Sequence, residues 1–242
     1  MGPGSPMTSF SLTSFNARWG LTVEDQPFDL ARAVRDFDTD VVVLQELWEP
    51  AEGGSGLPEA AAQLGYRLVH APLSPSFVVP APNITAHPSE AAGTWGVALL
   101  SRLPLHRTRI VNLGRMVERW DVADREAILA DVGIGTSVVT VAALHLSFAL
   151  PNALAQIRRL SGYLPRHQPT VVAGDCNLWG PLATSVLQGH RRAVRGRTWP
   201  SARPHSQLDH ILVSPSIEVV EATVLGPHGS DHRPVQARLR IR

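Results

Sequence analysis

The chain has 242 residues, of which 44% are apolar and 18% are charged, with 22 basic side chains against 21 acidic ones. This composition is typical of a single globular domain that buries a sizeable core without disulfides or a structural metal. The one cysteine, Cys176, excludes an internal disulfide and a cysteine-rich zinc module. The formal net charge of +1 provides no overall field for a polyanion, so the arginines, which are the only basic residues besides histidine, must bind any phosphate locally.

The two ends of the chain bear on domain organisation and location. Residues 1–6 (MGPGSP) are typical of an expression remnant, so we expect Met7 to be the native start and residues 7–242 to form one domain. The sequence contains no run of about 18 apolar residues and no signal-peptide pattern. We therefore expect a cytoplasmic protein with no stable membrane insertion, and no feature predicts an obligate protein partner.

The first third of the chain alternates between strand and helix patterns. Strands are expected at residues 9–16, 41–44 and 66–69, and helices at residues 28–37 and 58–64. The second helix would have Pro58 in its first turn, where proline is tolerated. Residues 71–93 contain five prolines and little periodicity, which predicts a long surface loop within one domain.

The rest of the chain is rich in strands. One amphipathic helix is expected at residues 152–164, where Leu154, Ile157 and Leu160 share a stripe. Strands are expected at residues 94–100, 105–113, 126–132, 137–144, 170–174, 208–213, 218–225 and 235–241. Many strands with a few helices predict a mixed α/β architecture built on two packed sheets.

Acidic, amide and imidazole side chains recur where the predicted strands end. These residues are Asn16, Glu46, His145, Asp175, Asn177, Asp209, Asp231 and His232. Carboxylate and amide oxygens are hard ligands that suit Mg²⁺ or Mn²⁺ better than zinc. Asp175 and Asn177 are two residues apart, so an extended chain places them on one face and turns Cys176 away, which favours a packed thiol over a nucleophile.

Six short blocks contain these residues in a fixed order. They are Ser14-Phe15-Asn16, Leu44-Gln45-Glu46, Leu144-His145-Leu146, Gly174-Asp175-Cys176-Asn177, Leu208-Asp209-His210-Ile211 and Ser230-Asp231-His232-Arg233-Pro234. Together they resemble the signature of the endonuclease/exonuclease/phosphatase superfamily, over residues 10–240. The resemblance implies a metal-dependent phosphoesterase with a four-layer α/β/β/α sandwich, in which two mixed sheets pack face to face between outer helices.

The resemblance also implies a metal centre and a site for the attacking water. Glu46 would be the principal ligand of Mg²⁺, with Mn²⁺ as the alternative ion, and Asn16 and Asp231 would help to hold it. Asp175 and Asn177 would hold the attacking water and the phosphoryl oxygens. This chemistry suits an anionic phosphodiester, which repels hydroxide unless its charge is neutralised.

The same resemblance assigns two histidines and an arginine. Asp209 would pair with His232 and fix its tautomer, as a carboxylate does for the imidazole of a catalytic triad. His145 would contact the phosphate, either as a cation or as a hydrogen-bonding group. Arg125 would reach the phosphate, and a surface ion pair with Asp124 or Glu126 is the alternative ranked just below it.

The substrate is less constrained, because the superfamily contains nucleases, phosphoinositide phosphatases and sphingomyelinases. Ala17 follows Asn16 where the abasic-site nucleases have an acidic residue, and His145 lies where they have a tyrosine-containing segment, so the deoxyribonuclease, sphingomyelinase and inositol-phosphatase side is closer. The candidate substrate-binding arginines, beside Arg125, are Arg191, Arg192, Arg195 and Arg197. They favour a nucleic acid, with a phospholipid as the alternative. A non-catalytic protein and a cysteine hydrolase are the remaining hypotheses.

Overall fold

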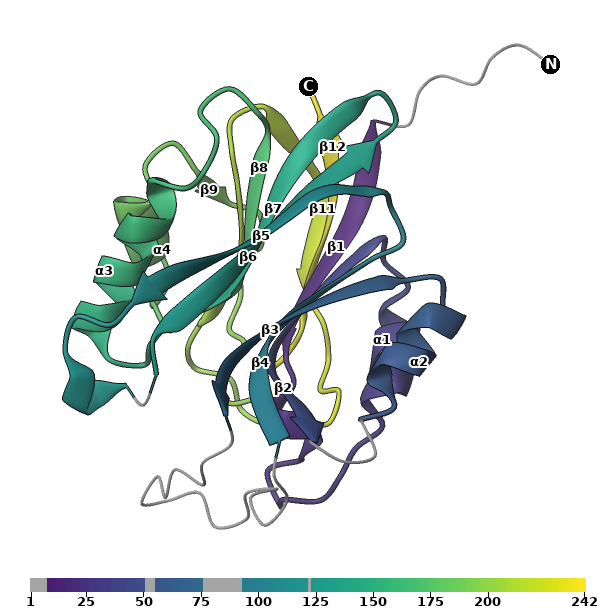
Figure 1. Cartoon of the computed structure of the whole chain (residues 1–242), viewed down its shortest axis with the longest axis vertical. Coiled ribbons are helices and arrows are strands. Elements are labelled where there is room, and N and C mark those ends of the chain that lie inside the picture. The colour runs from purple at the N-terminus through teal and green to yellow at the C-terminus, as the bar shows by residue number, and fades with distance from the viewer. Residues whose placement is uncertain (1–7, 51–54, 76–92, 122) are drawn as a thin grey trace.

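The computed structural model describes residues 8–50, 55–75, 93–121 and 123–242. These residues form two six-stranded mixed sheets that pack face to face, with helices on the outside (Figure 1). The expected four-layer α/β/β/α sandwich is therefore confirmed. Within the described residues, no helix is both long enough and apolar enough to cross a membrane. The expected cytoplasmic location stays a prediction, and residues 1–6, expected to be an expression remnant, lie outside the described residues.

The first sheet combines strands from both ends of the chain. In order across the sheet, its strands are β11 (Ile217–Val224), β12 (Val235–Ile241), β1 (Ser9–Asn16), β2 (Val41–Pro50), β4 (Gly93–Ser101) and β3 (Arg67–Pro75). β1 and β2 run parallel, and the other neighbours run antiparallel. The C-terminal strands thus return to the sheet in which the chain begins.

The second sheet is built from the middle of the chain. Its strands are, in order, β5 (Leu105–Gly114), β6 (Arg125–Ile134), β7 (Ser137–His145), β8 (Thr170–Asp175), β10 (Asp209–Val213) and β9 (Arg191–Arg192). β7 and β8 run parallel, and the remaining pairs run antiparallel. Each sheet therefore has one parallel pair near its centre, and in each pair both strands end at the same edge.

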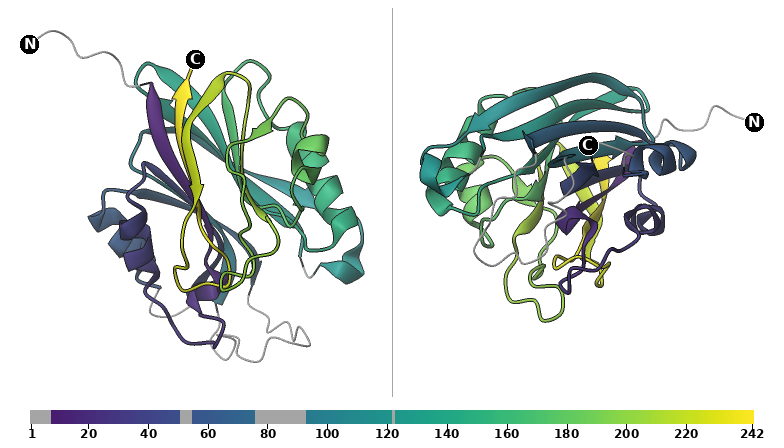
Figure 2. Two further views of the ribbon diagram at one scale, coloured as in Figure 1. Left: turned by 180° about the vertical axis from the view of Figure 1, so that it is seen from behind. Right: turned by 60° about the horizontal axis from the view of Figure 1, so that its bottom comes forward.

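Two pairs of helices cover the outer faces of the sheets. α1 (Leu30–Phe37) and α2 (Leu57–Gln63) cover the first sheet, while α3 (Leu150–Ser161) and α4 (Leu182–Val186) cover the second (Figure 2). Single 3₁₀ turns, η1 (Arg18–Gly20) and η2 (Glu118–Trp120), follow β1 and β5. Asp29 caps α1 by accepting a hydrogen bond from the Arg32 backbone N–H at 2.8 Å.

Alternation along the strands divides the core into three clusters. In β7, Val139, Val141 and Ala143 face the other sheet, whereas Ala142 and Leu144 face the outer helices. All five side chains are fully buried. Both faces of the central strands are thus covered, which explains their nearly continuous apolar sequences.

Several boundaries differ from the sequence-based expectations. β2 continues past Leu44 to Pro50, and β3 continues to Pro75, so the beginning of the expected loop at residues 71–93 is strand, while residues 76–92 lie outside the described residues. The helix expected at residues 152–164 begins earlier, because proline is accepted in its first turn, and it ends before Gly162. The short elements α4 and β9 were not predicted from periodicity, which needs longer runs.

Candidate active site

The polar residues of the sequence blocks meet where the strand ends of the two sheets converge. Asn16 ends β1 in the first sheet, and His145 and Asp175 end β7 and β8 in the second. His145 and Asp175 are paired in the parallel register, and Asp209, the first residue of β10, lies opposite Asp175. The loop between β11 and β12 brings His232 to the same place. The structure thus joins side chains that are up to 216 positions apart, from Asn16 to His232.

Glu46 is turned into the site by an irregularity in β2. The register with β4 shifts between Leu44 and Leu47, and Glu46 has a φ of 52°, a left-handed conformation that is rare for residues other than glycine. Asn16 Nδ2 donates hydrogen bonds to Glu46 Oε1 at 3.1 Å and to Asp175 Oδ2 at 3.0 Å. Asn16 therefore joins the carboxylates of the two sheets.

Asn177 is held by the turn that follows β8. Its backbone N–H donates to Asp175 Oδ1 at 2.9 Å, and its φ of 49° is again left-handed. Its side-chain Nδ2 donates to the Leu146 carbonyl at 3.0 Å and lies 3.4 Å from His145 Nε2. Gly174 permits this close packing, because a Cβ there would lie 1.9 Å from the Leu144 carbonyl oxygen.

His232 and Asp209 form a buried dyad. His232 Nδ1 lies 2.9 Å from Asp209 Oδ2, which leaves Nε2 directed toward Asp175 Oδ2 at 3.8 Å. Burial lowers the pKa of His232, but the charges of Asp209 and Asp175 outweigh it and raise the pKa to about 10. His232 is therefore a cation at neutral pH, with its Nε2–H available to an anion.

His145 is the neutral member of the two histidines. Burial and the nearby Arg125 cation lower its pKa to about 3. Its Nε2 lies 3.7 Å from Asp175 Oδ2 and 3.9 Å from Glu46 Oε1. Of the two roles expected for His145, the structure favours a neutral hydrogen-bonding group over a cation.

The donor set fits a hard divalent cation. Burial, Asp231 and Asp175 raise the pKa of Glu46 to about 7, although Asn16 opposes the shift. Like charges gathered in a partly buried place are unfavourable by themselves, and a divalent cation would relieve this repulsion. Asp231 accepts hydrogen bonds from Trp199 Nε1 at 3.1 Å and from the Ser230 hydroxyl at 3.3 Å, which fixes its carboxylate beside Glu46.

Within the described residues, the possible ligand atoms of Asp175, Asp209 and His232 lie within 4.8 Å of one another. The hydrogen bond of the dyad, however, already uses Asp209 Oδ2 and His232 Nδ1. A cation between these two atoms would break that bond. We therefore describe Asp209 and His232 as a dyad, and the expectation that the cation binds at Glu46 stays a prediction.

Arg125 is a buried residue with a buried partner. It is 7% exposed, and its Nη2 lies 3.4 Å from Asp121 Oδ1. Its Cζ lies 5.2 Å from the ring centroid of Trp95, which in turn packs edge-on against His145. The surface ion pair considered from the sequence is therefore wrong, because the partner is a buried carboxylate four residues upstream.

The other four arginines are distributed along a longer path. Arg191 pairs with Val213, at the end of β10 far from Asp209, and its guanidinium donates to the Ile217 carbonyl at 2.9 Å. Arg192 donates to Gln207 Oε1 at 3.2 Å. Arg195 and Arg197 are exposed on the segment leading to Thr198. The structure thus does not bring Arg191 to the site, and it leaves the substrate role of the others a prediction.

Supporting residues surround the site, and of these Thr198 carries no sequence signal of its own. Thr198 Oγ1 accepts hydrogen bonds from the backbone N–H groups of Leu208 at 3.1 Å and Asp209 at 3.3 Å. His210 is fully buried, and its Nε2 lies 2.9 Å from the Leu178 carbonyl, just after Asn177. Cys176 is fully buried, and burial raises the pKa of its thiol, which agrees with the packed thiol expected from the sequence.

Comparisons with known proteins agree with this arrangement. The sequence model of the Endonuclease/Exonuclease/phosphatase family matches residues 13–232. The chain is 25% identical to the uncharacterized protein YbhP of Escherichia coli K12 over 274 residues, which cover 96% of this chain and 97% of YbhP. Two solved structures under 25% identical show that the fold is shared.

The first of these structures is an endonuclease/exonuclease/phosphatase from Beutenbergia cavernae, with a TM-score of 0.74 and 22% identity over 97% of this chain and 72% of that chain. The second is the mannosyl-6-phosphatase Bt3783 of Bacteroides thetaiotaomicron, with a TM-score of 0.72 and 16% identity over 95% of this chain and 99% of that one.

Proposed function

This chain belongs to the endonuclease/exonuclease/phosphatase family, whose members hydrolyse phosphate esters, and we propose that it hydrolyses a phosphodiester with the help of Mg²⁺ or Mn²⁺. The observation that carries the proposal is the Asp209–His232 dyad, which aims a protonated Nε2 at Asp175 beside Glu46. A cation, an oriented imidazole and carboxylates around one small space are what water attack on a phosphodiester requires.

Each residue has a role that follows from its position. Glu46 and the carboxylate of Asp231 would hold the cation, which when bound neutralises phosphate charge and makes water more acidic. Asn16 Oδ1 accepts from the Arg18 backbone N–H at 3.0 Å and its Nδ2 faces Glu46, so the amide would have to turn over to add its oxygen to this set. Asp175 would accept a hydrogen bond from the attacking water and orient it toward phosphorus. Asn177 would donate to a phosphoryl oxygen from its side-chain amide.

The histidines complete the assignment. His232 would donate its Nε2 proton to an oxygen on which negative charge develops, while Asp209 stabilises the imidazolium. His145 would form a neutral hydrogen bond to the phosphate. Arg125 would neutralise a second phosphoryl oxygen with its buried guanidinium.

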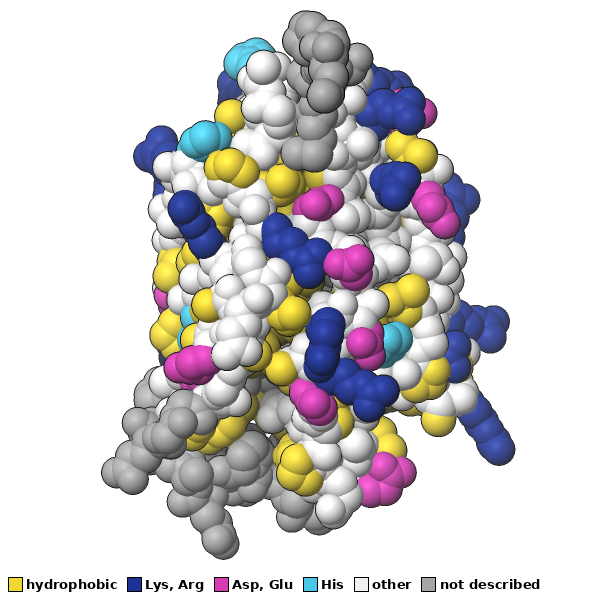
Figure 3. All heavy atoms as spheres, turned by 90° about the vertical axis from the view of Figure 1, so that its right-hand side faces the viewer, with side chains coloured by type: hydrophobic (Ala, Val, Ile, Leu, Met, Phe, Trp, Pro, Cys, Tyr) yellow, Lys and Arg dark blue, Asp and Glu magenta, His cyan; other side chains and the backbone are white. Residues whose placement is uncertain are grey.

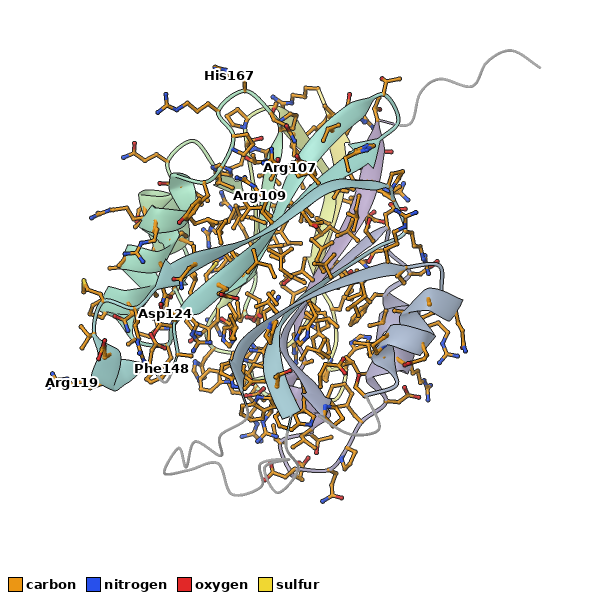
Figure 4. The ribbon with its side chains drawn as sticks, in the orientation of Figure 1. Arg107, Arg109, Arg119, Asp124, Phe148 and His167 are labelled. Atoms are coloured by element: carbon orange, nitrogen blue, oxygen red, sulfur yellow. The ribbon has the colours of Figure 1, made fainter. Side chains whose placement is uncertain are left out.

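Exposed aromatic rings that closely follow site residues in the sequence favour a nucleic acid as the substrate. Phe148, which is 73% exposed, follows His145 by three residues, and Trp179, which is 61% exposed, follows Asn177 by two. Figure 4 shows Phe148 at the outer edge of the molecule, near Arg119. Nucleobases stack on such rings. A phospholipid is the second candidate, because Met116 is also 59% exposed near this edge.

The charge pattern limits how a polymer would be held. On the face that carries α1 and α2, the described residues show arginines and carboxylates interspersed (Figure 3). That face therefore presents mixed charge to a polyanion. A nucleic acid would instead be held near the site, by Arg125 and by the exposed Arg195 and Arg197.

The test is hydrolysis of bis-p-nitrophenyl phosphate with Mg²⁺, with Mn²⁺ and with a chelator. We expect turnover to require the cation, to be lost in Asp175→Asn, and to persist in Cys176→Ala, the matched control at the next position. Turnover that survives the chelator, or that is lost in Cys176→Ala while this variant remains folded, would contradict the proposal. Single- and double-stranded DNA, RNA, sphingomyelin and phosphoinositides, tested in the same buffers, then identify the natural class.

A further inference from the structure

The buried guanidinium of Arg125 is the first of three polar side chains that are connected by hydrogen bonds. Asp121 accepts from Arg125 Nη2 through Oδ1 and from Asn152 Nδ2 through Oδ2, at 3.4 Å and 2.6 Å. The side chains of Arg125 and Asp121 are 8% and 1% exposed, and Asn152 is fully buried. Three buried polar residues thus form a line that leads away from the active site.

Asn152 uses its whole amide group in this arrangement. Its Oδ1 accepts hydrogen bonds from the backbone N–H groups of Met116 at 3.0 Å and Val117 at 2.8 Å. Its Nδ2 donates to the Val117 carbonyl at 3.1 Å as well as to Asp121. The amide therefore fastens the segment before η2 to the first turn of α3. Figure 4 shows this corner, with Arg119, Asp124 and Phe148 labelled around it.

At the other end of the line, one nitrogen of the Arg125 guanidinium makes no hydrogen bond to the described residues. Its Nη1 is buried and has no hydrogen-bond partner within the described part of the chain. The guanidinium is held over Trp95, and the charges of Glu46 and Asp175 act on it. A buried donor without a partner is costly, and an anionic oxygen in the site would satisfy it.

We propose that Asn152 is a positioning residue for the substrate phosphate, acting through Asp121 to aim the free arm of Arg125 into the site. The proposal rests on the proposed function, because it requires a phosphate group beside Arg125. Guanidinium–phosphate contacts depend on orientation, since the donors form a rigid planar fork. A carboxylate bonded only to its arginine could rotate together with it. Asp121 cannot, because its second oxygen accepts the hydrogen bond from Asn152.

The test compares two buried amides of the same helix. Asn152→Ala removes the link to Asp121. Gln156→Ala is the matched control, because Gln156 is equally buried and bonds the Ser147 N–H and the Gly114 carbonyl, both at 2.8 Å. Gly114 is the cross-strand partner of Arg125, but Gln156 bonds its carbonyl and not the side chain of Arg125, Asp121 or Asn152. For each variant, the inhibition constant of inorganic phosphate is measured against bis-p-nitrophenyl phosphate turnover, together with KM, kcat and the thermal midpoint.

We expect Asn152→Ala to raise the inhibition constant and KM about tenfold, with a smaller change in kcat, because a misaimed guanidinium weakens phosphate binding. Gln156→Ala should lower the thermal midpoint by a similar amount but leave the inhibition constant within about twofold. In Arg125→Ala, adding Asn152→Ala should cause no further loss of phosphate binding, since the two residues act as one unit. Asp121→Asn should weaken phosphate binding as Asn152→Ala does. Because asparagine has nearly the same shape as aspartate, this variant provides the test if Asn152→Ala does not fold.

The outcomes separate this inference from the function on which it rests. If Arg125→Ala leaves phosphate inhibition unchanged, Arg125 does not bind the phosphate and its part in the proposed function is wrong. If Arg125→Ala weakens inhibition but Asn152→Ala and Asp121→Asn do not, the function stands and the positioning role is refuted. Equal loss in Asn152→Ala and Gln156→Ala would show a general structural effect and would also refute it.

Discussion

The pairing of Asp209 with His232 allows the loss of kcat to be predicted for a variant in which the negative charge of Asp209 is removed. Opposite unit charges 2.9 Å apart attract by about 6 kcal/mol at an effective dielectric constant of 20. Asp209→Asn abolishes this charge but keeps the side-chain shape, so part of the orientation survives through a neutral hydrogen bond. We expect kcat for bis-p-nitrophenyl phosphate to fall by about 10² to 10⁴, since each 1.4 kcal/mol is a factor of ten.

The double-mutant cycle decides whether the two residues act together. The kcat of His232→Ala should be reduced at least as far as that of Asp209→Asn, and the kcat of the double variant should be little lower than that of His232→Ala. Asp131→Asn is the control, because its carboxylate accepts from the Thr140 hydroxyl and Gln168 away from the site, and it should keep kcat. Losses that multiply in the double variant would show that Asp209 and His232 act separately and would refute the dyad.

Three further predictions test the metal, the arginines and a buried histidine. Glu46→Gln keeps an oxygen but loses its charge, so calorimetry should show Mg²⁺ affinity reduced at least about tenfold; undiminished affinity would contradict the metal assignment. Replacing Arg195 and Arg197 with serine should flatten the salt dependence of polyanion binding by a slope of about 1.5, whereas Arg191→Ser, far from the site, should not; equal effects would remove the distinction. Burial lowers the pKa of His210 from 6.5, so below that pH the unfolded chain binds a proton that the folded protein does not, and stability falls. Denaturant titration of His210→Asn should show a smaller fall between pH 6.5 and 5, and an unchanged fall would exclude this source of acid sensitivity.

Much of the site could be predicted because its residues lie at the ends of regular strands. Apolar runs show where a buried strand lies, and a polar residue that closes such a run must face the edge of the sheet, as Asn16 and Asp175 do. The order of the blocks supplied the family. The pairing of Asp209 with His232 is seen in the structure as expected, at 2.9 Å. Their catalytic roles stay predictions.

The supporting contacts could not be predicted, because they depend on register between segments that share no local pattern. Nothing around Asp121 or Asn152 distinguishes them from surface residues in the sequence, and their contact requires η2 to lie against α3. For the arginines, in contrast, the sequence suggested a cluster that the structure does not contain. Arg191 lies close to Arg195 in sequence, but β9 carries Arg191 to the far end of β10. Clustering along a chain is therefore a poor guide to clustering in space when a strand intervenes.

The position of the proposed catalytic groups at the junction of two sheets has a consequence for how activity responds to heat. Asn16 and Glu46 belong to one sheet and Asp175 to the other. Asn16 Nδ2 bonds Glu46 at 3.1 Å within its own sheet and Asp175 at 3.0 Å across to the other sheet. A slide of one sheet over the other by about an ångström would break this bridge while both sheets remained folded. Catalysis thus reports the alignment of the two layers rather than the integrity of either one. On warming, turnover should decline before the far-ultraviolet circular dichroism does.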